Sequence, residues 1–91
     1  MKPLYSLEDG ALIKRRDHLD VHPECIYPLN VKEADFRSYL RAFALHPEND
    51  HTTFEHITFS RYKDNIRIQA SPDGFFDLPT THALAIVLGA Q

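Results

Sequence analysis

The chain has little of what marks secreted or membrane-spanning proteins. Cys25 is the single cysteine in 91 residues, so no internal disulfide can form, and a reducing, cytoplasmic location is the expectation. No window approaches the roughly 20 apolar residues that a membrane span needs. The first residues also lack an apolar run long enough for a signal peptide. These absences predict a soluble cytoplasmic protein.

Reaction motifs and excess positive charge are missing as well. The sequence has no nucleophile elbow, glycine-rich phosphate loop or His-Glu-x-x-His pattern, so we expect neither an enzyme nor a bound cofactor. The formal net charge is -3 and the pI is about 6.0. Domains dedicated to nucleic acid are usually net basic, so this charge argues against that class.

What the chain does contain is enough apolar material for one core. Hydrophobic residues make up 43% of the sequence and aromatic residues 11%. At this length we expect a single small α+β domain over residues 1–91, without room for a second core.

A hairpin is the clearest element in the sequence. Two strand-like runs, Thr53–Tyr62 and Asn65–Ala70, are joined by Lys63-Asp64. Asp and Asn tolerate left-handed backbone angles, which favours a turn of two residues at this place.

The parity of that turn decides which side chains are buried. Side chains alternate along a strand, so Ile66 and Ile68 share one face. An even-numbered connection puts Ile57 and Phe59 on the same face. Phe54 has the opposite parity, and we predict a β-bulge near Glu55-His56 that returns it to the core side.

The other face of the hairpin is polar and is our first candidate for a working surface. Tyr and Arg are residue types that protein interfaces favour. The predicted partner-binding residues are Thr58, Ser60, Tyr62, Arg67 and Gln69.

The segment before the long helix is harder to interpret. Over residues 4–19, Asp9-Gly10 favours a tight turn between two short strands, and a helix capped by Ser6 is the alternative. Pro23 and Pro28 then bracket a segment that can be at most a short edge strand or an extended linker.

A long amphipathic helix is predicted from Val31 to about His46. Asn30 is a suitable N-cap and Glu33 a suitable capping-box partner. The apolar stripe of this helix should pack on the buried face of the sheet; its members are Phe36, Tyr39, Leu40 and Phe43. Arg37 and Arg41 should face away from it.

The end of the chain predicts a turn, a strand and a second helix. Ser71–Gly74 has the residue pattern of a type I turn, and a short strand should follow over Phe75–Leu78. An apolar helix should begin near Thr80 and stop at Gly89. A helix so apolar all round is either buried or shared, and a homodimer through it is one expectation.

Two alternative chemistries come from other residues. His18, His22 and Cys25, in the spacing His-x3-His-x2-Cys, are possible zinc ligands, and Asp17 or Asp20 could complete a fourth position, as a small metal-dependent enzyme would require; the paired ligands of structural zinc sites are missing. Residues that could act as general acids or bases are also present, but their spacing does not indicate which two would act together. They are His51, His56, His82, Asp50, Glu55 and Asp77.

A nucleic-acid-binding regulator is the other alternative. It would need a stripe of basic side chains that contacts phosphates. The residues available for it are Lys14, Arg15, Arg16, Arg37 and Arg41.

The leading interpretation is a non-catalytic module that binds one protein. We predict an antiparallel sheet of three to five strands, one long helix on one face, and a short apolar C-terminal helix. The expected role is to inhibit or regulate a specific partner, as small immunity proteins or phage-encoded regulators do. We expect neither a metal nor a membrane to take part.

Overall fold

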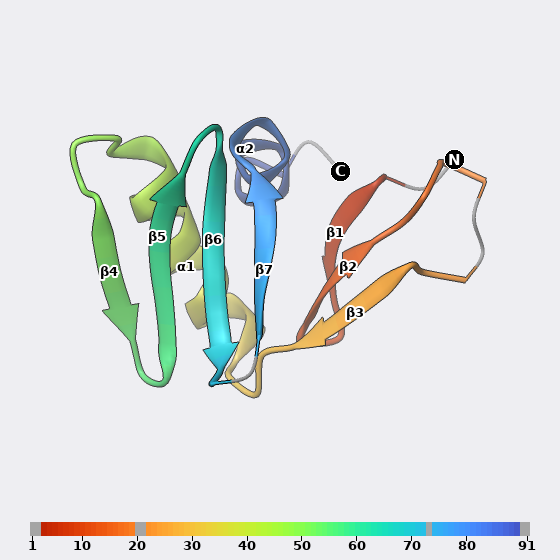
Figure 1. Ribbon diagram of the computed structural model, residues 1–91, viewed down its shortest axis with the longest axis horizontal. Helices are drawn as coiled ribbons and strands as arrows, with labels where there is room; N and C mark the ends of the chain where they lie inside the picture. The colour runs from red at the N-terminus through yellow and green to blue at the C-terminus, as the bar shows by residue number, and fades with distance from the viewer. Residues whose placement is uncertain (1–2, 20–21, 73, 90–91) are drawn as a thin grey trace.

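The computed structural model describes residues 3–19, 22–72 and 74–89, which form two antiparallel sheets and two helices (Figure 1). The elements in chain order are β1 (Tyr5–Glu8), β2 (Ala11–Lys14), β3 (Cys25–Pro28), α1 (Glu33–Leu45), β4 (His51–Phe54), β5 (Ile57–Tyr62), β6 (Asn65–Ser71), β7 (Gly74–Pro79) and α2 (Thr80–Val87). The α+β class is as predicted. The prediction of one sheet is wrong, because β1–β3 form a sheet separate from β4–β7.

The N-terminal segment forms strands and not the alternative helix. Asp9 and Gly10 both have positive φ, 52° and 75°, and connect β1 to β2. A tight turn between twisted strands needs such angles. β3 pairs with β2 and, with Pro28 as its last residue, is an edge strand.

The central hairpin has the predicted register. Tyr62 pairs with Asn65 across the two-residue turn, and Phe59 pairs with Ile68. Ile57, Phe59, Ile66 and Ile68 are consequently buried on one face. The left-handed angle falls on Lys63, with φ 56°, and not on Asp64.

The predicted bulge at Glu55-His56 is wrong. These two residues form a second tight turn, in which Phe54 pairs with Ile57 and Glu55 has φ 54°. The run Thr53–Tyr62 is therefore two strands, β4 and β5. Phe54 still lies on the core side, because this connection too has an even number of residues.

Helix α1 starts two residues later than predicted, and its cap is different. Lys32 is the N-cap and has no side-chain capping bond, while Asn30 has φ 58° outside the helix. Glu33 does not reach back to Asn30. It accepts a hydrogen bond from the backbone N–H of Gly10, 3.1 Å away, and so ties α1 to the β1–β2 turn.

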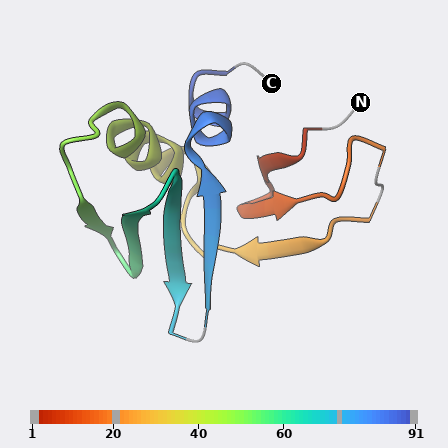
Figure 2. The same cartoon turned by 45° about the horizontal axis from the view of Figure 1, so that its top comes forward.

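The apolar stripe of α1 is buried against the four-stranded sheet. Phe36, Leu40 and Phe43 are fully enclosed, and the rings of Phe36 and Phe43 lie against Phe59. Tyr39, predicted as part of the stripe, is instead 44% exposed. Figure 2 shows both helices on the same side of the four-stranded sheet and the three-stranded sheet beyond β7.

Helix α2 follows β7 directly, and Gly89 beyond its end has φ 73°. The helix packs against α1, β1 and β7, and Ala83, Ile86 and Val87 are buried. Most of the apolar surface that suggested a shared helix is thus internal. Dimerisation through α2 remains a prediction.

The turn between β6 and β7 is described only in part. Ser71 pairs with Gly74, as the predicted turn requires, but Asp73 lies outside the described residues. The predicted strand after the turn is confirmed within β7, and a register shift interrupts the pairing between Ile68 and Ser71.

Tyr27 joins the two sheets. Its hydroxyl donates to the carbonyl of Gly74, at 3.0 Å, and accepts from the N–H of Ala70, at 2.8 Å. Leu7 and Leu12 of the smaller sheet belong to the same core as the helices. In the part of the chain that the structure describes, neither helix has the length and apolar character to cross a membrane.

Candidate protein-binding face

One face of the four-stranded sheet is not covered by a helix. Figure 1 shows β4–β7 in front of α1, and no described element lies over the near side. The strand registers assign the side chains of this open face, which are His51, Thr53, Thr58, Ser60, Tyr62, Asn65, Arg67, Gln69, Phe75, Asp77 and Pro79.

Arg67 lies at the centre of this face and links three strands. Its guanidinium donates two hydrogen bonds to Asp77 on β7, at 2.9 and 3.1 Å. The guanidinium carbon also lies over the ring of Tyr62 on β5, 4.1 Å from its centroid, and over the ring of Phe75 on β7, at 3.9 Å. Tyr62, Arg67 and Phe75 form a stack across the sheet, which we call the aromatic stack.

The charge of the stack is fixed and balanced. The hydrogen bond to Asp77 raises the pKa of the Arg67 guanidinium above its ordinary value, while desolvation acts in the opposite direction. Arg67 is therefore always cationic, and the Asp77 carboxylate beside it cancels its charge locally. The centre of the open face presents planar apolar groups without net charge.

The two rings of the stack are unusually exposed for aromatic side chains. Tyr62 is 44% exposed and Phe75 is 53% exposed. Contact with the guanidinium restricts their rotamers in the free protein, so a partner would order them at a reduced entropic cost. Exposed Tyr and Arg side chains of this kind are enriched among residues that dominate binding energy.

Shallow hollows lie on either side of the stack. One, of about 380 Å³, is lined by His56, Thr58, Gln69, Ala70, Ser71 and Pro72. The other, of about 330 Å³, lies between β3 and β7 and is lined by Lys14, Glu24, Cys25, Phe75, Phe76 and Asp77. Together with the exposed rings, these hollows give the open face a relief that shape complementarity can use.

The five residues predicted for partner binding all lie on the open face: Thr58, Ser60, Tyr62, Arg67 and Gln69. The sequence interpretation missed Phe75 and Asp77. Their parity relative to the buried Phe76 could have placed them on the outer face.

The five basic residues of the nucleic-acid alternative do not form one exposed stripe. Arg15 is only 6% exposed and donates to Ser6 and Glu8. Arg37, predicted to face away, donates to the carbonyl of Ile86 in α2. Lys14 is 3.8 Å from a carboxylate oxygen of Glu24, while Arg16 and Arg41 are exposed elsewhere.

The possible zinc ligands of the metal-enzyme alternative do not lie together. Among the described residues, which leave out Asp20, no three His, Cys, Asp or Glu side chains lie close enough to hold a metal ion. His18 and His22 are exposed, and Cys25 is half-buried in β3.

The acid-base candidates are also separated. His56 places Nε2 2.8 Å from the carbonyl of Leu29, and the ring of His82 lies 4.8 Å from that of Tyr5. His51 is at the opposite end of β4 from His56.

Comparison of the chain with protein-family models, with curated proteins and with solved structures finds no match. The aromatic stack on the open face is the feature from which we argue function.

Proposed function

We propose that the protein is a non-catalytic binding module that inhibits or regulates one protein partner through its open face. The single observation that supports this most is the aromatic stack, which presents two exposed rings around a neutralised cation. The role would resemble that of small immunity proteins or phage-encoded regulators. The single cysteine favours action in the cytoplasm.

The chemistry of the stack suits a protein better than a nucleic acid. Phosphate binding needs cations that are free to neutralise phosphates and so displace the counterions of the nucleic acid, and Arg67 is already paired with Asp77. Base stacking uses ring faces, and the guanidinium already covers one face of Tyr62 and one of Phe75, so only the opposite faces remain for it. An apolar or aromatic protein side chain can contact ring edges and the hollows beside them.

Capture of the partner from extracts of the native host tests the proposal. Wild-type protein should recover one stoichiometric partner, and Tyr62→Ala or Phe75→Ala should reduce the recovered amount at least tenfold. Leu45→Ala is the matched control. The exposed fraction of Leu45, 43%, is similar to that of Tyr62, but Leu45 lies at the end of α1 and not on the open face. The control should bind like wild type.

Two results would count against this function. One is repeated failure to recover any stoichiometric protein. The other is equal recovery by the Tyr62, Phe75 and Leu45 variants, which would place binding elsewhere. Each variant should first show the wild-type circular dichroism spectrum and melting temperature, so that loss of binding is not loss of folding.

A further inference from the structure

The outer edge of β4 has backbone groups free to pair with another strand. The tight turn of the β5–β6 hairpin makes Tyr62 and Asn65 a hydrogen-bonded pair, and such pairs alternate along the strands. It follows that the hydrogen-bonded pairs between β5 and β4 are Ile57 with Phe54 and Phe59 with Thr52. The N–H and C=O groups of His51 and Thr53 therefore point away from the sheet.

The other edge of the four-stranded sheet is covered, whereas no described element covers the outer edge of β4. β7 ends at Pro79, which has no N–H. The three-stranded sheet lies beside β7, and Tyr27 of that sheet donates a hydrogen bond to Gly74 of β7. β3 ends at Pro28. β4 is short, at four residues, but within the described residues it lacks the other usual devices against pairing, since it contains no proline, lysine or bulge.

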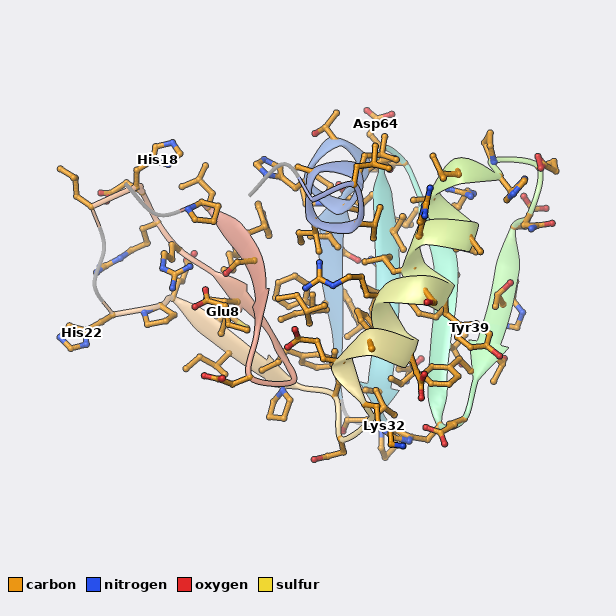
Figure 3. All side chains as sticks on the ribbon, turned by 180° about the vertical axis from the view of Figure 1, so that it is seen from behind. Glu8, His18, His22, Lys32, Tyr39 and Asp64 are labelled. Atoms are coloured by element: carbon orange, nitrogen blue, oxygen red, sulfur yellow. The ribbon has the colours of Figure 1, made fainter. Side chains whose placement is uncertain are left out.

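An apolar hollow of about 250 Å³ lies on the flank of α1 next to this edge and is lined by Ser38, Tyr39 and Ala42. Tyr39 joins the hollow to β4, because its ring stacks on that of Phe54 with centroids 4.2 Å apart and an interplanar angle of 16°. Figure 3 shows Tyr39 directed from α1 toward β4. A strand added to β4 would bring alternate side chains over this hollow.

The ends of the edge are acidic. Asp50 precedes β4 and Glu55 follows it. Asp35 on α1 and Glu55 line a second hollow, of about 690 Å³, together with Asp9 and a single cation, Lys32. An occupant with basic residues at its ends would complement these charges.

From these observations we propose a second interaction surface, the β4 edge, defined by β4, Tyr39 and Ala42. It accepts an extended segment of another protein as an added strand. The segment carries an apolar side chain for the hollow and a Lys or Arg for the carboxylates of Asp35 and Glu55. The β4 edge adjoins the open face, which carries the side chains of His51 and Thr53, but it does not use the aromatic stack, so the proposal does not depend on the function proposed above.

Backbone pairing gives the affinity in this mode, and the hollow and the carboxylates give the selectivity. His51 and Thr53 together offer two donors and two acceptors, enough for four hydrogen bonds with one extended segment. At about 3.3 Å per residue, five or six residues of the segment would span β4 and reach Glu55.

The test uses blocked seven-residue peptides that have arginine at both ends and alternating valine and threonine between. Two peptides, with valine at odd or at even positions, cover both phases of alternation. The full chain is titrated with each peptide and followed by backbone amide NMR. At least one of the two peptides should shift the amide resonances of His51, Thr53 and Tyr39. The same peptide with glutamate at both ends should bind at least tenfold more weakly.

Two controls separate strand addition from general stickiness. Methylation of the peptide nitrogens that face β4 should weaken binding at least tenfold, while methylation of the alternate nitrogens should not. Ala42→Arg should also weaken binding tenfold or more, because it fills the hollow and repels a basic peptide. Ala34→Arg, the same change on the solvent side of α1, should have less than a twofold effect.

Three results would overturn the proposal. One is the absence of shifts at millimolar concentrations of both arginine-ended peptides. Another is a set of shifts centred on Tyr62 and Phe75. The third is a dimeric mass of the free protein that Thr53→Lys converts to a monomer, because that would assign the β4 edge to a second copy of the chain.

Discussion

Arg61 is predicted to be the main stabiliser of the end of helix α1. The last carbonyls of a helix have no partner within the helix, and α1 has no basic residue in its last turn. Arg61 reaches this end of the helix from β5. It donates to the carbonyls of Phe43, His46 and Asn49, and its guanidinium lies 4.2 Å from the centroid of the Phe43 ring.

The magnitude follows from these contacts for the change Arg61→Met. The charged hydrogen bond to the part-buried Phe43 carbonyl contributes about 1.5 kcal/mol. The bonds to the other two carbonyls contribute little, because these more exposed groups can bind water instead. A cation near a helix C-terminus adds about 0.5 kcal/mol. The contact with the Phe43 ring adds about 0.7 kcal/mol. The total is about 3 kcal/mol, or a fall in Tm of roughly 12–24 °C for a domain of this size.

Denaturant and thermal unfolding followed by circular dichroism would measure this change. Arg61→Lys should lie between wild type and Arg61→Met, because an ammonium keeps the charge but cannot reproduce the planar fork. Arg41→Met, an exposed arginine on α1, is the control and should shift the free energy of unfolding by less than about 0.5 kcal/mol. The reasoning is refuted if Arg61→Met is as mild as this control.

Three further changes test other parts of the fold by the same denaturation measurement. Tyr27→Phe should cost about 1–3 kcal/mol, because it leaves an N–H and a carbonyl between the sheets without their partner, whereas Tyr62→Phe on the open face should cost little. Lys63→Gly should gain about 1 kcal/mol by removing the strain of a positive φ, a gain that Asp64→Gly should not show. Arg15→Met should stay within about 1 kcal/mol of wild type, because its partner Glu8 is half-exposed and can be solvated without it; a much larger loss would show that the buried guanidinium is net stabilising relative to methionine.

The central hairpin could be predicted because its information is local. The period of two in side-chain direction, combined with an even-numbered turn, determines which residues of both strands are buried. The burial of Ile57 and Phe59 could therefore be predicted from Ile66 and Ile68 without reference to the rest of the chain. The same rule returned Phe54 to the core even though a bulge was predicted where a turn occurs.

The errors arose where distant contacts override a local signal. Asn30 and Glu33 have the spacing of a capping box, but Glu33 gains a hydrogen bond to Gly10, 23 residues away in sequence. Glu55 is not a residue type that marks a left-handed turn, so the end of β4 had no sequence signal. The way in which the two sheets meet likewise depends on Tyr27, whose partners lie more than 40 residues further along the chain.

The open face was predictable as a set of residues but not as an arrangement. Tyr62, Arg67 and Gln69 follow from the parity of one hairpin. The stacking of Arg67 between Tyr62 and Phe75 also needs the register of β6 with β7, which shifts between Ile68 and Ser71. No residue pattern in this stretch specifies that shift, so Phe75 and Asp77 could not be aligned with Arg67 from the sequence.

The open face and the β4 edge are near enough to serve one partner. Adjacent strands lie about 4.8 Å apart, so the aromatic stack is only one to three strand spacings from β4, or roughly 5–14 Å. A standard protein interface, of about 800 Å² per partner, is wide enough to cover both. If one protein contacts both surfaces, Tyr62→Ala and Ala42→Arg should each weaken the binding of that protein. Their effects on the binding free energy should add, because the two substituted residues do not contact each other. If two proteins are involved, each variant should lose a different one, and the module would then join two partners rather than inhibit one.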